Sequence, residues 1–416
     1  MQVIERFKEL SRVERCSFKS EAMRDYLVEQ GKTCGYEVTV DEAGNVLCHK
    51  EGSTLSLQSH YDMVCIGKAP KLEMFEEAGW LKARESTLGA DNGMGMAMML
   101  CLMAEDAPVD CLFTADEEVG LLGARALDVP LKDVPMLNLD SEAEGEVTIG
   151  CAGGVDVMAV MPLTYETKTA HCYRIEVSGL PGGHSGVDIH KNIPNAIKEL
   201  VAQIDAGALL VELEGGERRN SIAKRAHAVI ASEVELEGHE YLGQQEVAVV
   251  NESGDVLKML RDFAHGVRVN NEELGIVHSS INLAQIMMDE KGFNVQLSAR
   301  SMETQDLCDL EAETVAYFED FGCVVATEGF YPPWSPEQNV FAKEVLEANM
   351  AVFENASFGA IHAGLECGVI KERYPAIDMA SIGPNIVAPH STAEAVELAS
   401  VERVFEVVRK IVGQLI

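Results

Sequence analysis

The chain has 416 residues, and 47% of them are hydrophobic, so it can bury more than one large core. Its 33 lysine and arginine residues stand against 68 aspartate and glutamate residues, which gives a net charge of −35. So acidic a protein is not expected to bind nucleic acid or an anionic membrane. No stretch approaches the roughly 20 apolar residues of a membrane-spanning helix, and the amphipathic start lacks the apolar core of a signal peptide.

The cysteines suggest a compartment. There are 11 of them, scattered singly and without a C-x-x-C pair. This pattern predicts reduced thiols and a cytoplasmic location. Cys65, Cys101 and Cys151 are expected to be small residues of the core.

Helical patterns open the chain and short strands follow them. Residues 1–30 are predicted as helices, with a stop at Gly31. Residues 36–40 and 45–49 alternate around a turn, as in a hairpin. The next strand, 55–59, leads into the first stretch with candidate chemistry.

His60 and Asp62 follow this strand and alternate across Tyr61. Since residues i and i+2 of a strand point to the same face, His60 can face a metal while Asp62 holds its imidazole. A buried histidine paired with a neighbouring aspartate explains the same two residues without a metal.

A densely apolar stretch, 94–102, predicts a buried helix, and Asp91 and Asn92 lie at its start. Asp91 is either a cap of this helix or a metal ligand. The glycines around it do not form a phosphate loop, because neither G-x-G-x-x-G nor a Lys-Ser/Thr pair is present. Nucleotide binding is therefore not indicated.

Two further strands end in acids. Strand 109–114 is followed by three consecutive acids that include Glu117 and Glu118, and strand 135–139 is followed by Asp140. Acids can simply complement a helix N-terminus, but a cation explains a cluster at the end of an apolar strand more economically. Strands that end in acids, with helices between them, predict a doubly wound α/β sheet with functional groups at the strand C-termini.

The composition changes in the middle of the chain. We predict that residues 166–332 form a separate α+β domain inserted into a first domain of residues 1–165 and 333–416. Within the insertion, residues 241–266 are predicted as helical. His184 lies in the glycine-rich loop G-L-P-G-G-H-S-G, which can approach a ligand closely, although a solvated loop histidine is the alternative.

His390 follows an apolar strand and a proline, and residues 392–416 after it predict a packing helix. With it, the candidate ligands comprise two imidazoles and three carboxylates: His60, Asp91, Glu118, Asp140 and His390. Such a set suits two Zn²⁺ ions that share one carboxylate, or Mn²⁺ or Co²⁺ in the same place. Glu117, next to a ligand, is free to act as general base on a water activated by the ions.

Six motifs occur in order along the chain: S-H-Y-D-M-V, G-A-D-N-G-M-G-M-A, F-T-A-D-E-E-V-G, L-D-S-E, G-G-H-S-G-V-D-I-H and H-A-G-L-E-C-G. They resemble the dizinc metallopeptidases that include carboxypeptidase G, aminoacylase and carnosinase. The resemblance is strongest to the aminoacyl-histidine dipeptidase (Xaa-His dipeptidase) branch. One such motif is weak evidence, whereas six in this order are specific.

This resemblance implies how the metals are shared. Asp91 would bridge both ions. His60 and Asp140 would complete one site. Glu118 and His390 would complete the other.

The resemblance also implies roles around the metals. Asp62 would orient the histidine ligand beside it, and Glu117 would be the base. His184 would help polarise the scissile carbonyl, and Arg300 would bind a substrate carboxylate, with a surface strand arginine as the alternative. The further substrate-side candidates are Glu366 and His362.

The leading hypothesis is metal-dependent hydrolysis of small peptides, namely Xaa-His or other dipeptides, by a hydroxide that bridges the two metals. An aminoacylase-like N-acyl amino acid amidohydrolase shares the ligand set and remains open. The third reading is a non-catalytic metal-binding scaffold on the same fold. The resemblance further implies that the inserted domain, 166–332, is a lid and often the dimerisation surface, so a homodimer through the lid and a monomer both remain open.

Overall fold

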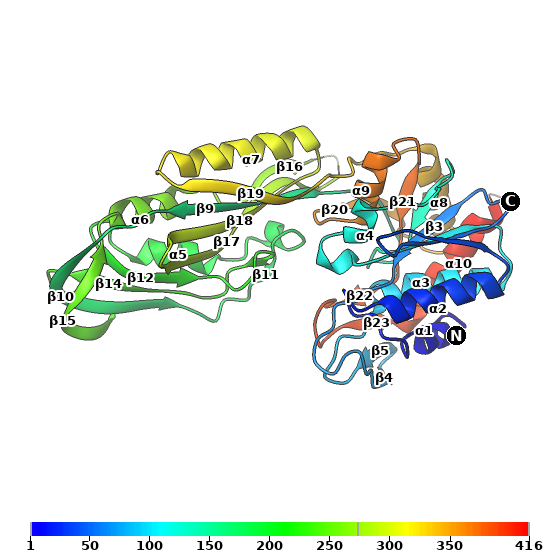
Figure 1. Ribbon diagram of the computed structural model, residues 1–416, viewed down its shortest axis with the longest axis horizontal. Helices are drawn as coiled ribbons and strands as arrows, with labels where there is room; N and C mark the ends of the chain where they lie inside the picture. Colours follow the sequence, from blue (N-terminus) through cyan, green and yellow to red (C-terminus); the bar gives the residue numbers. More distant parts are fainter. Residues whose placement is uncertain (1, 273, 415–416) are drawn as a thin grey trace. The chain divides into compact units, whose positions relative to one another are not determined.

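The computed structural model describes residues 2–272 and 274–414, and it divides into two compact units (Figure 1). The first unit contains residues 1–151, 334–360 and 365–416, and the second contains residues 152–333 and 361–364. The second unit begins earlier than the expected residue 166. The reason is strand β9 (Gly153–Met161), which pairs with strands of the second unit's sheet.

A mixed sheet forms the centre of the first unit. Among the described residues it has eight strands in the order β1 (Glu37–Val40), β2 (Val46–His49), β6 (Asp110–Thr114), β3 (Ser56–His60), β7 (Met136–Asn138), β21 (Met379–Ser381), β8 (Glu146–Cys151) and β20 (Ser357–Ile361). The inner strands β6, β3, β7 and β21 are parallel. Strands β2 and β8 run antiparallel to their inner neighbours, and the β1–β2 hairpin is confirmed.

Helices cover both faces of this sheet (Figure 1). They are α1 (Gln2–Leu10), α2 (Glu21–Thr33), α3 (Ala90–Ala104), α4 (Leu122–Arg125), α8 (Val340–Met350), α9 (Glu366–Arg373) and α10 (Leu398–Gln414). Leu57 of β3 packs in one apolar core with α1, α2, α3, α8 and α10. Its neighbour Gln58 points to the opposite face and donates to Glu366, where α9 begins. This is the predicted doubly wound α/β arrangement.

Helix α2 passes through Gly31 instead of stopping there, and it ends at Thr33. A Cβ atom at Gly31 would lie 2.6 Å from Cys48 Sγ and 2.8 Å from Val38 Cγ2. The glycine therefore lets the helix approach the sheet closely, which a sequence pattern does not distinguish from a helix stop.

A small antiparallel sheet in the same unit corrects the prediction for the C-terminal run. Its order is β22 (Ile386–Val387), β23 (Ala395–Glu397), β5 (Trp80–Ala83) and β4 (Met74–Glu77). Because Ala395 and Val396 pair with β5, the helix predicted from residue 392 begins only at Leu398. The last two residues of that prediction lie outside the described residues.

The second unit is built on one large sheet. Its described strands follow the order β15 (Glu240–Val250), β10 (Tyr165–Val177), β14 (Ala226–Ser232), β12 (Leu209–Gly215), β17 (Ile276–Asp289), β18 (Gly292–Ser301), β9 and β19 (Val324–Tyr331), with β16 (Gly266–Asn271) also paired to β17. Helices α5 (Ala196–Gln203), α6 (Ser253–Asp262) and α7 (Thr304–Glu319) share one core with it and so cover the same face. The short strands β11 (Gly183–His184) and β13 (Ser221–Ile222) pair separately.

The predicted helix 241–266 is wrong in its first half. Residues 240–250 form β15, which pairs antiparallel with β10 along most of its length. Only Ser253–Asp262 is helical. Pairing with a long neighbouring strand outweighed the weak local preference of this polar stretch.

The chain leaves the first unit after Cys151 and returns to it at Trp334. The two residues exchange a pair of backbone hydrogen bonds, each with an N···O distance of 2.9 Å. The points of departure and return are therefore adjacent. In the part of the chain that the structure describes, no helix is long and apolar enough to cross a membrane.

Candidate metal centre

Three parallel strands of the first unit bring acids and a histidine to one edge of the sheet. His60 is the last residue of β3, whose register places it beside the end of β6. Glu117 and Glu118 follow β6 in the 3₁₀ turn η1 (Glu117–Val119). Asp140 follows β7, which pairs with β3 on its other side. The carboxyl ends of these strands therefore present all four side chains together.

Asp91 reaches the same edge from the start of α3. Asp91 and Asn92 lack helical backbone angles, since φ and ψ of Asp91 are −76° and 115°. Asp91 Oδ1 lies 3.0 Å from Nε2 of His60, and its Oδ2 lies 3.1 Å from Nε2 of His390. One carboxylate thus stands between two imidazoles.

Each imidazole has a second carboxylate. Asp140 Oδ1 lies 3.4 Å from His60 Nε2, and Glu118 Oε2 lies 2.7 Å from His390 Nε2. The structure therefore brings all five expected ligands together as two groups that share Asp91. Donor atoms of His60, Asp91 and Glu118 all lie within 4.8 Å of one another, as the ligands of one cation would.

The charges of this cluster fit a cation. Burial, together with the charge of Asp91, raises the pKa of Glu118 to about 7, and burial also raises the pKa of Asp140. Burial opposes protonation of the imidazoles, but the carboxylates outweigh it: they raise the pKa of His390 to about 11 and that of His60 well above its ordinary value. In the absence of a cation, protonation of these groups reduces the repulsion among the carboxylates. A divalent ion would relieve the same repulsion, so the donor set suits metal binding.

Glu117 stands beside the ligands. Its Oε2 lies 4.0 Å from His60 Nε2. Burial raises its pKa well above the ordinary range, and the charge of Glu118 adds to the shift. A carboxylate with a raised pKa holds a proton more readily near neutral pH, as a general base must.

Asp62 connects His60 to the turn that carries Glu117. Its Oδ1 lies 3.4 Å from His60 Nδ1 and accepts the Glu117 backbone N–H at 2.9 Å. Its Oδ2 accepts the Ser17 hydroxyl at 2.8 Å. Burial opposes ionisation, but these hydrogen bonds keep the pKa of Asp62 below its usual value. Asp62 therefore remains a charged carboxylate that faces Nδ1 of His60.

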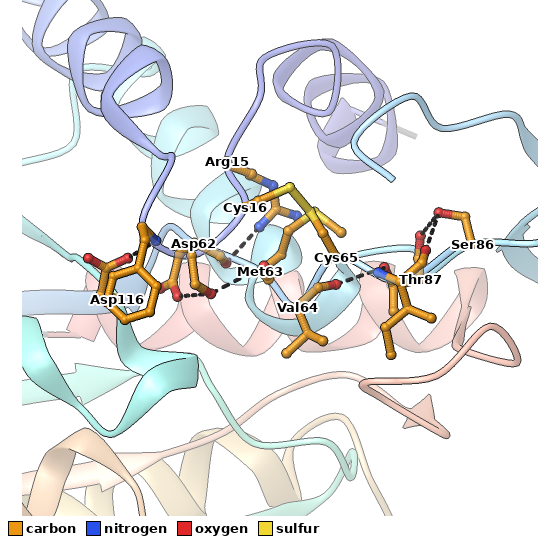
Figure 2. Close-up of a disulfide and its surroundings, with 12 residues drawn as sticks. Arg15, Cys16, Asp62, Met63, Val64, Cys65, Ser86, Thr87 and Asp116 are labelled. Atoms are coloured by element: carbon orange, nitrogen blue, oxygen red, sulfur yellow. Dashed lines mark hydrogen bonds between the residues drawn. A yellow bond between two sulfur atoms is a disulfide. The ribbon is translucent and has the colours of Figure 1, made fainter. Parts of the chain in front are cut away.

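A disulfide joins Cys16 to Cys65 close to this aspartate (Figure 2). The prediction that Cys65 is a reduced core residue is therefore wrong, whereas Cys101 and Cys151 are free and buried as expected. Backbone hydrogen bonds hold the two segments side by side, among them Met63 N–H to Arg15 O at 2.9 Å. This pairing joins residues 49 apart in sequence, so single scattered cysteines gave no sign of it.

Two buried charged residues next to the cluster have no counterpart in the sequence predictions. Arg15 donates to the backbone carbonyls of Asp62 and Gly89. Glu394 accepts backbone N–H groups from the segment that leads into Asp91. The only sequence signal for Glu394 is its position four residues after His390. Nothing in the sequence distinguishes Arg15 from a surface arginine.

Glu366 belongs to the first unit and is fully buried. Its Oε2 accepts from Gln58 at 2.5 Å and from the Thr114 hydroxyl at 2.6 Å. Burial, with the charge of Asp140, raises its pKa to about 7. Its charge also raises the pKa of Glu117, so Glu366 lies near the acids of the cluster.

The other predicted substrate-side residues belong to the second unit. Arg300 on β18 is only 7% exposed, so it is not a surface strand arginine, and it donates to the Tyr331 hydroxyl at 2.7 Å. His362 lies 2.8 Å from the Ser280 hydroxyl, and burial together with the Arg300 charge lowers its pKa to about 3. His184 Nδ1 accepts from the backbone N–H of residue 187 at 3.1 Å.

Known proteins resemble the chain over almost its whole length. It is 31% identical to the cytosol non-specific dipeptidase of Escherichia coli (strain K12), with 95% of this chain and 93% of that protein aligned. Among solved structures, an aminoacylhistidine dipeptidase from Vibrio alginolyticus is 28% identical, with a TM-score of 0.81 over 100% of this chain and 96% of the other. Human carnosine dipeptidase 1 is 12% identical, with a TM-score of 0.58 over 99% and 96%, and shares the fold.

Residues 56–414 match the model of the peptidase family M20/M25/M40. This match includes the strand ends that carry His60 and Asp140 and the loop that carries His390. The resemblance seen in the six motifs is confirmed at the level of the family. The chain is a peptidase and belongs to the M20/M25/M40 family.

Proposed function

We propose that this peptidase hydrolyses dipeptides at a centre for two divalent metal ions, with Zn²⁺ as the expected ion and Mn²⁺ or Co²⁺ as alternatives. The observation that carries the proposal is the Asp91 carboxylate between two imidazoles, each of which has a second carboxylate. The dipeptidases among its relatives support the choice of substrate. When bound, the ions would polarise the scissile carbonyl and acidify a water.

The chain's own groups would hold the ions and move the proton. His60 and Asp140 would hold one ion. Glu118 and His390 would hold the other, and Asp91 would be shared by both. Glu117 takes the proton of the attacking water and passes it to the leaving amine. Asp62 keeps the histidine in the tautomer that leaves Nε2 free for the metal.

Residues of the second unit are proposed to act on the substrate. Arg300 would bind the terminal carboxylate, since a guanidinium matches a carboxylate with two parallel hydrogen bonds. His184 would donate to the oxyanion that develops at the carbonyl. Glu366 and His362 are assigned to the substrate side. We further propose a cytoplasmic location and a second unit that acts as a lid and joins two chains in a homodimer.

The base is tested by Glu117→Gln. This variant should bind metals as the wild type does and lose at least about 100-fold in kcat, because the amide cannot accept the proton. Metal content and steady-state kinetics measure the two effects. Asp116→Asn is the control, since Asp116 accepts the Phe18 backbone N–H at 2.7 Å and is not among the proposed ligands. Unchanged kcat in Glu117→Gln would refute the assignment of the base.

The substrate class is tested on metal-loaded wild-type protein with Xaa-His dipeptides, other dipeptides and N-acetyl amino acids in parallel. Dipeptides should be turned over fastest. Faster hydrolysis of the acetyl compounds would make the protein an amidohydrolase of acylated amino acids. No hydrolysis at full metal loading would leave a metal-binding scaffold.

A further inference from the structure

The carboxylate of Glu394 receives four consecutive backbone amides. Its Oε2 accepts the N–H of Leu88 at 2.7 Å and of Gly89 at 2.9 Å. Its Oε1 accepts the N–H of Ala90 at 2.7 Å and of Asp91 at 3.4 Å. Glu394 is buried, with 3% of its surface exposed. A buried charge with this many donors fixes both itself and the backbone that it contacts.

Arg15 holds the same backbone segment through a carbonyl. Its guanidinium donates to Gly89 O and, at 3.0 Å, to Asp62 O. Burial lowers the pKa of Arg15 to about 10, and Glu394 is the foremost of the charges that favour its protonated form. Arg15 is therefore a buried cation at neutral pH, and together with the Glu394 carboxyl group it holds the backbone segment 88–91.

This support matters because Asp91 is not positioned by its own helix. Asp91 and Asn92 have non-helical angles, and the N-cap residue, Gly89, has no side chain to cap the helix. The direction of the Asp91 carboxylate is set instead by groups outside the helix. Glu394 is the residue that bonds to the Asp91 amide itself.

Glu394 also lies four residues after His390, on the loop that enters β23. One side chain thus ties the segment of Asp91 to the segment of His390, which are about 300 residues apart in sequence. We propose that Glu394 is a positioning residue, which sets the Asp91 and His390 loops for metal binding before any ion arrives. The inference rests on the proposed metal centre and adds to it a residue that is not a ligand.

The experiment compares two variants of the full-length chain. Glu394→Gln keeps the shape of the side chain but removes the charge and replaces one acceptor oxygen with a donor. Asp110→Asn is the matched control: Asp110 is also buried, and it accepts the Lys50 backbone N–H at 2.9 Å and faces His49 Nδ1 at 2.8 Å, at the opposite end of β6. Zn²⁺ affinity is measured by titration of the metal-free proteins against a competing chelator, alongside thermal unfolding.

Both variants should unfold at lower temperature than the wild type, because each loses a buried charge-assisted hydrogen bond. Only Glu394→Gln should lose Zn²⁺ affinity, by about 10- to 100-fold. Wild-type affinity in folded Glu394→Gln, or an equal loss in Asp110→Asn, would overturn the proposal. If Glu394→Gln does not fold, Glu394→Asp takes its place. Wild-type Zn²⁺ affinity in Glu394→Asp, or an equal loss in Asp110→Asn, would then overturn the proposal.

Hydrogen exchange on the unaltered protein tests the idea without a variant. The amides of Leu88, Gly89 and Ala90 should be protected in the metal-free wild type as strongly as in the Zn²⁺-loaded protein. Protection that arises only when Zn²⁺ is added would mean that the metal orders the loop, which contradicts the proposal. None of these measurements requires peptide hydrolysis, so their failure is distinguishable from failure of the proposed dipeptidase activity.

Discussion

Carboxyl groups that follow β6 and β7 are protonated more easily in the folded, metal-free protein than in the unfolded chain. Burial, with the charge of Asp91, raises the pKa of Glu118 from 4.5 to about 7 and that of Glu142 to about 8. A group whose pKa is raised by folding contributes stability that is complete below its unfolded pKa and is lost as the pH rises through the folded pKa. Asp91 and Asp62, whose pKa values are lowered, lose their contribution only at acidic pH.

We therefore expect the metal-free protein to become less stable between about pH 4.5 and pH 8. Chelated protein should show a lower Tm at pH 8 than at pH 5.5. Addition of Zn²⁺ should raise the Tm more at pH 8, because the cation replaces the protons that the carboxylates have lost. Calorimetry at both pH values checks this. A metal-free Tm that rises across the range would contradict the charge distribution described above.

The candidate metal ligands that follow predicted strands could be identified from the sequence. His60, Glu118 and Asp140 each follow a predicted strand, and parallel strands bring their carboxyl ends to one edge. Glu394 and Arg15 could not be found this way, because their partners are backbone groups far away in sequence. A hydrogen bond between a side chain and a main-chain group far away in sequence leaves no recognisable motif in the sequence.

Among the elements, α2 and α6 offer a matched pair of glycines. Gly31→Ala in α2 should destabilise the protein by about 1–3 kcal/mol, because the new methyl group would overlap with Cys48 and Val38. Gly254→Ala in α6 should instead stabilise it by about 0.5 kcal/mol, since a Cβ there meets nothing within 4 Å. Urea unfolding measures both changes. Equal effects at the two positions would show that packing against the sheet does not decide the outcome.

The disulfide joins the segment before α2 to the segment after β3, which holds Asp62. Closing a loop between residues 49 apart should stabilise the protein by about 4 kcal/mol through the unfolded state. A dithiol reductant should therefore lower the Tm of the wild type, and Cys16→Ser should have that lower Tm with or without reductant. Cys308→Ser, at an exposed free cysteine, is the control. If the reductant leaves the Tm of the wild type unchanged, the disulfide does not stabilise the protein.

Elements with strong local patterns were predicted correctly, and elements that depend on distant partners were not. The apolar run of α3 and the alternating β1–β2 hairpin needed no tertiary information. Strand β15 and the late start of α10 needed the strands β10 and β5 beside them. Local preference is a weak guide where pairing with a remote strand decides.

At the scale of the whole molecule, the two-part organisation could be predicted, but its boundary could not. The shift in composition marked the insertion. Strand β9 was missed because it continues directly from β8, with only Ala152 between them, although it belongs to the other sheet. Gly150, Gly153 and Gly154 flank the crossing, but the apolar pattern of β8 continues into β9, so the change of sheet could not be recognised from the sequence.

The insertion should be removable. Replacing residues 152–333 by a short glycine-rich linker should leave a folded first unit, because Cys151 and Trp334 are already bonded to each other. All five proposed ligands remain in that unit. We expect the shortened protein to unfold cooperatively and to bind Zn²⁺, and to have lost dipeptide turnover with Arg300 and His184. A shortened chain that neither folds nor binds Zn²⁺ would refute this expectation.

The two backbone hydrogen bonds between Cys151 and Trp334 bring the ends of the inserted unit together, so the unit should be exchangeable as one segment. We expect changes within its sheet to leave the register of the strands that carry the proposed ligands undisturbed. Because the chain leaves and re-enters the first unit at adjacent points, we expect exchange of this segment to alter the proposed substrate-binding residues Arg300 and His184 and to retain the proposed metal ligands.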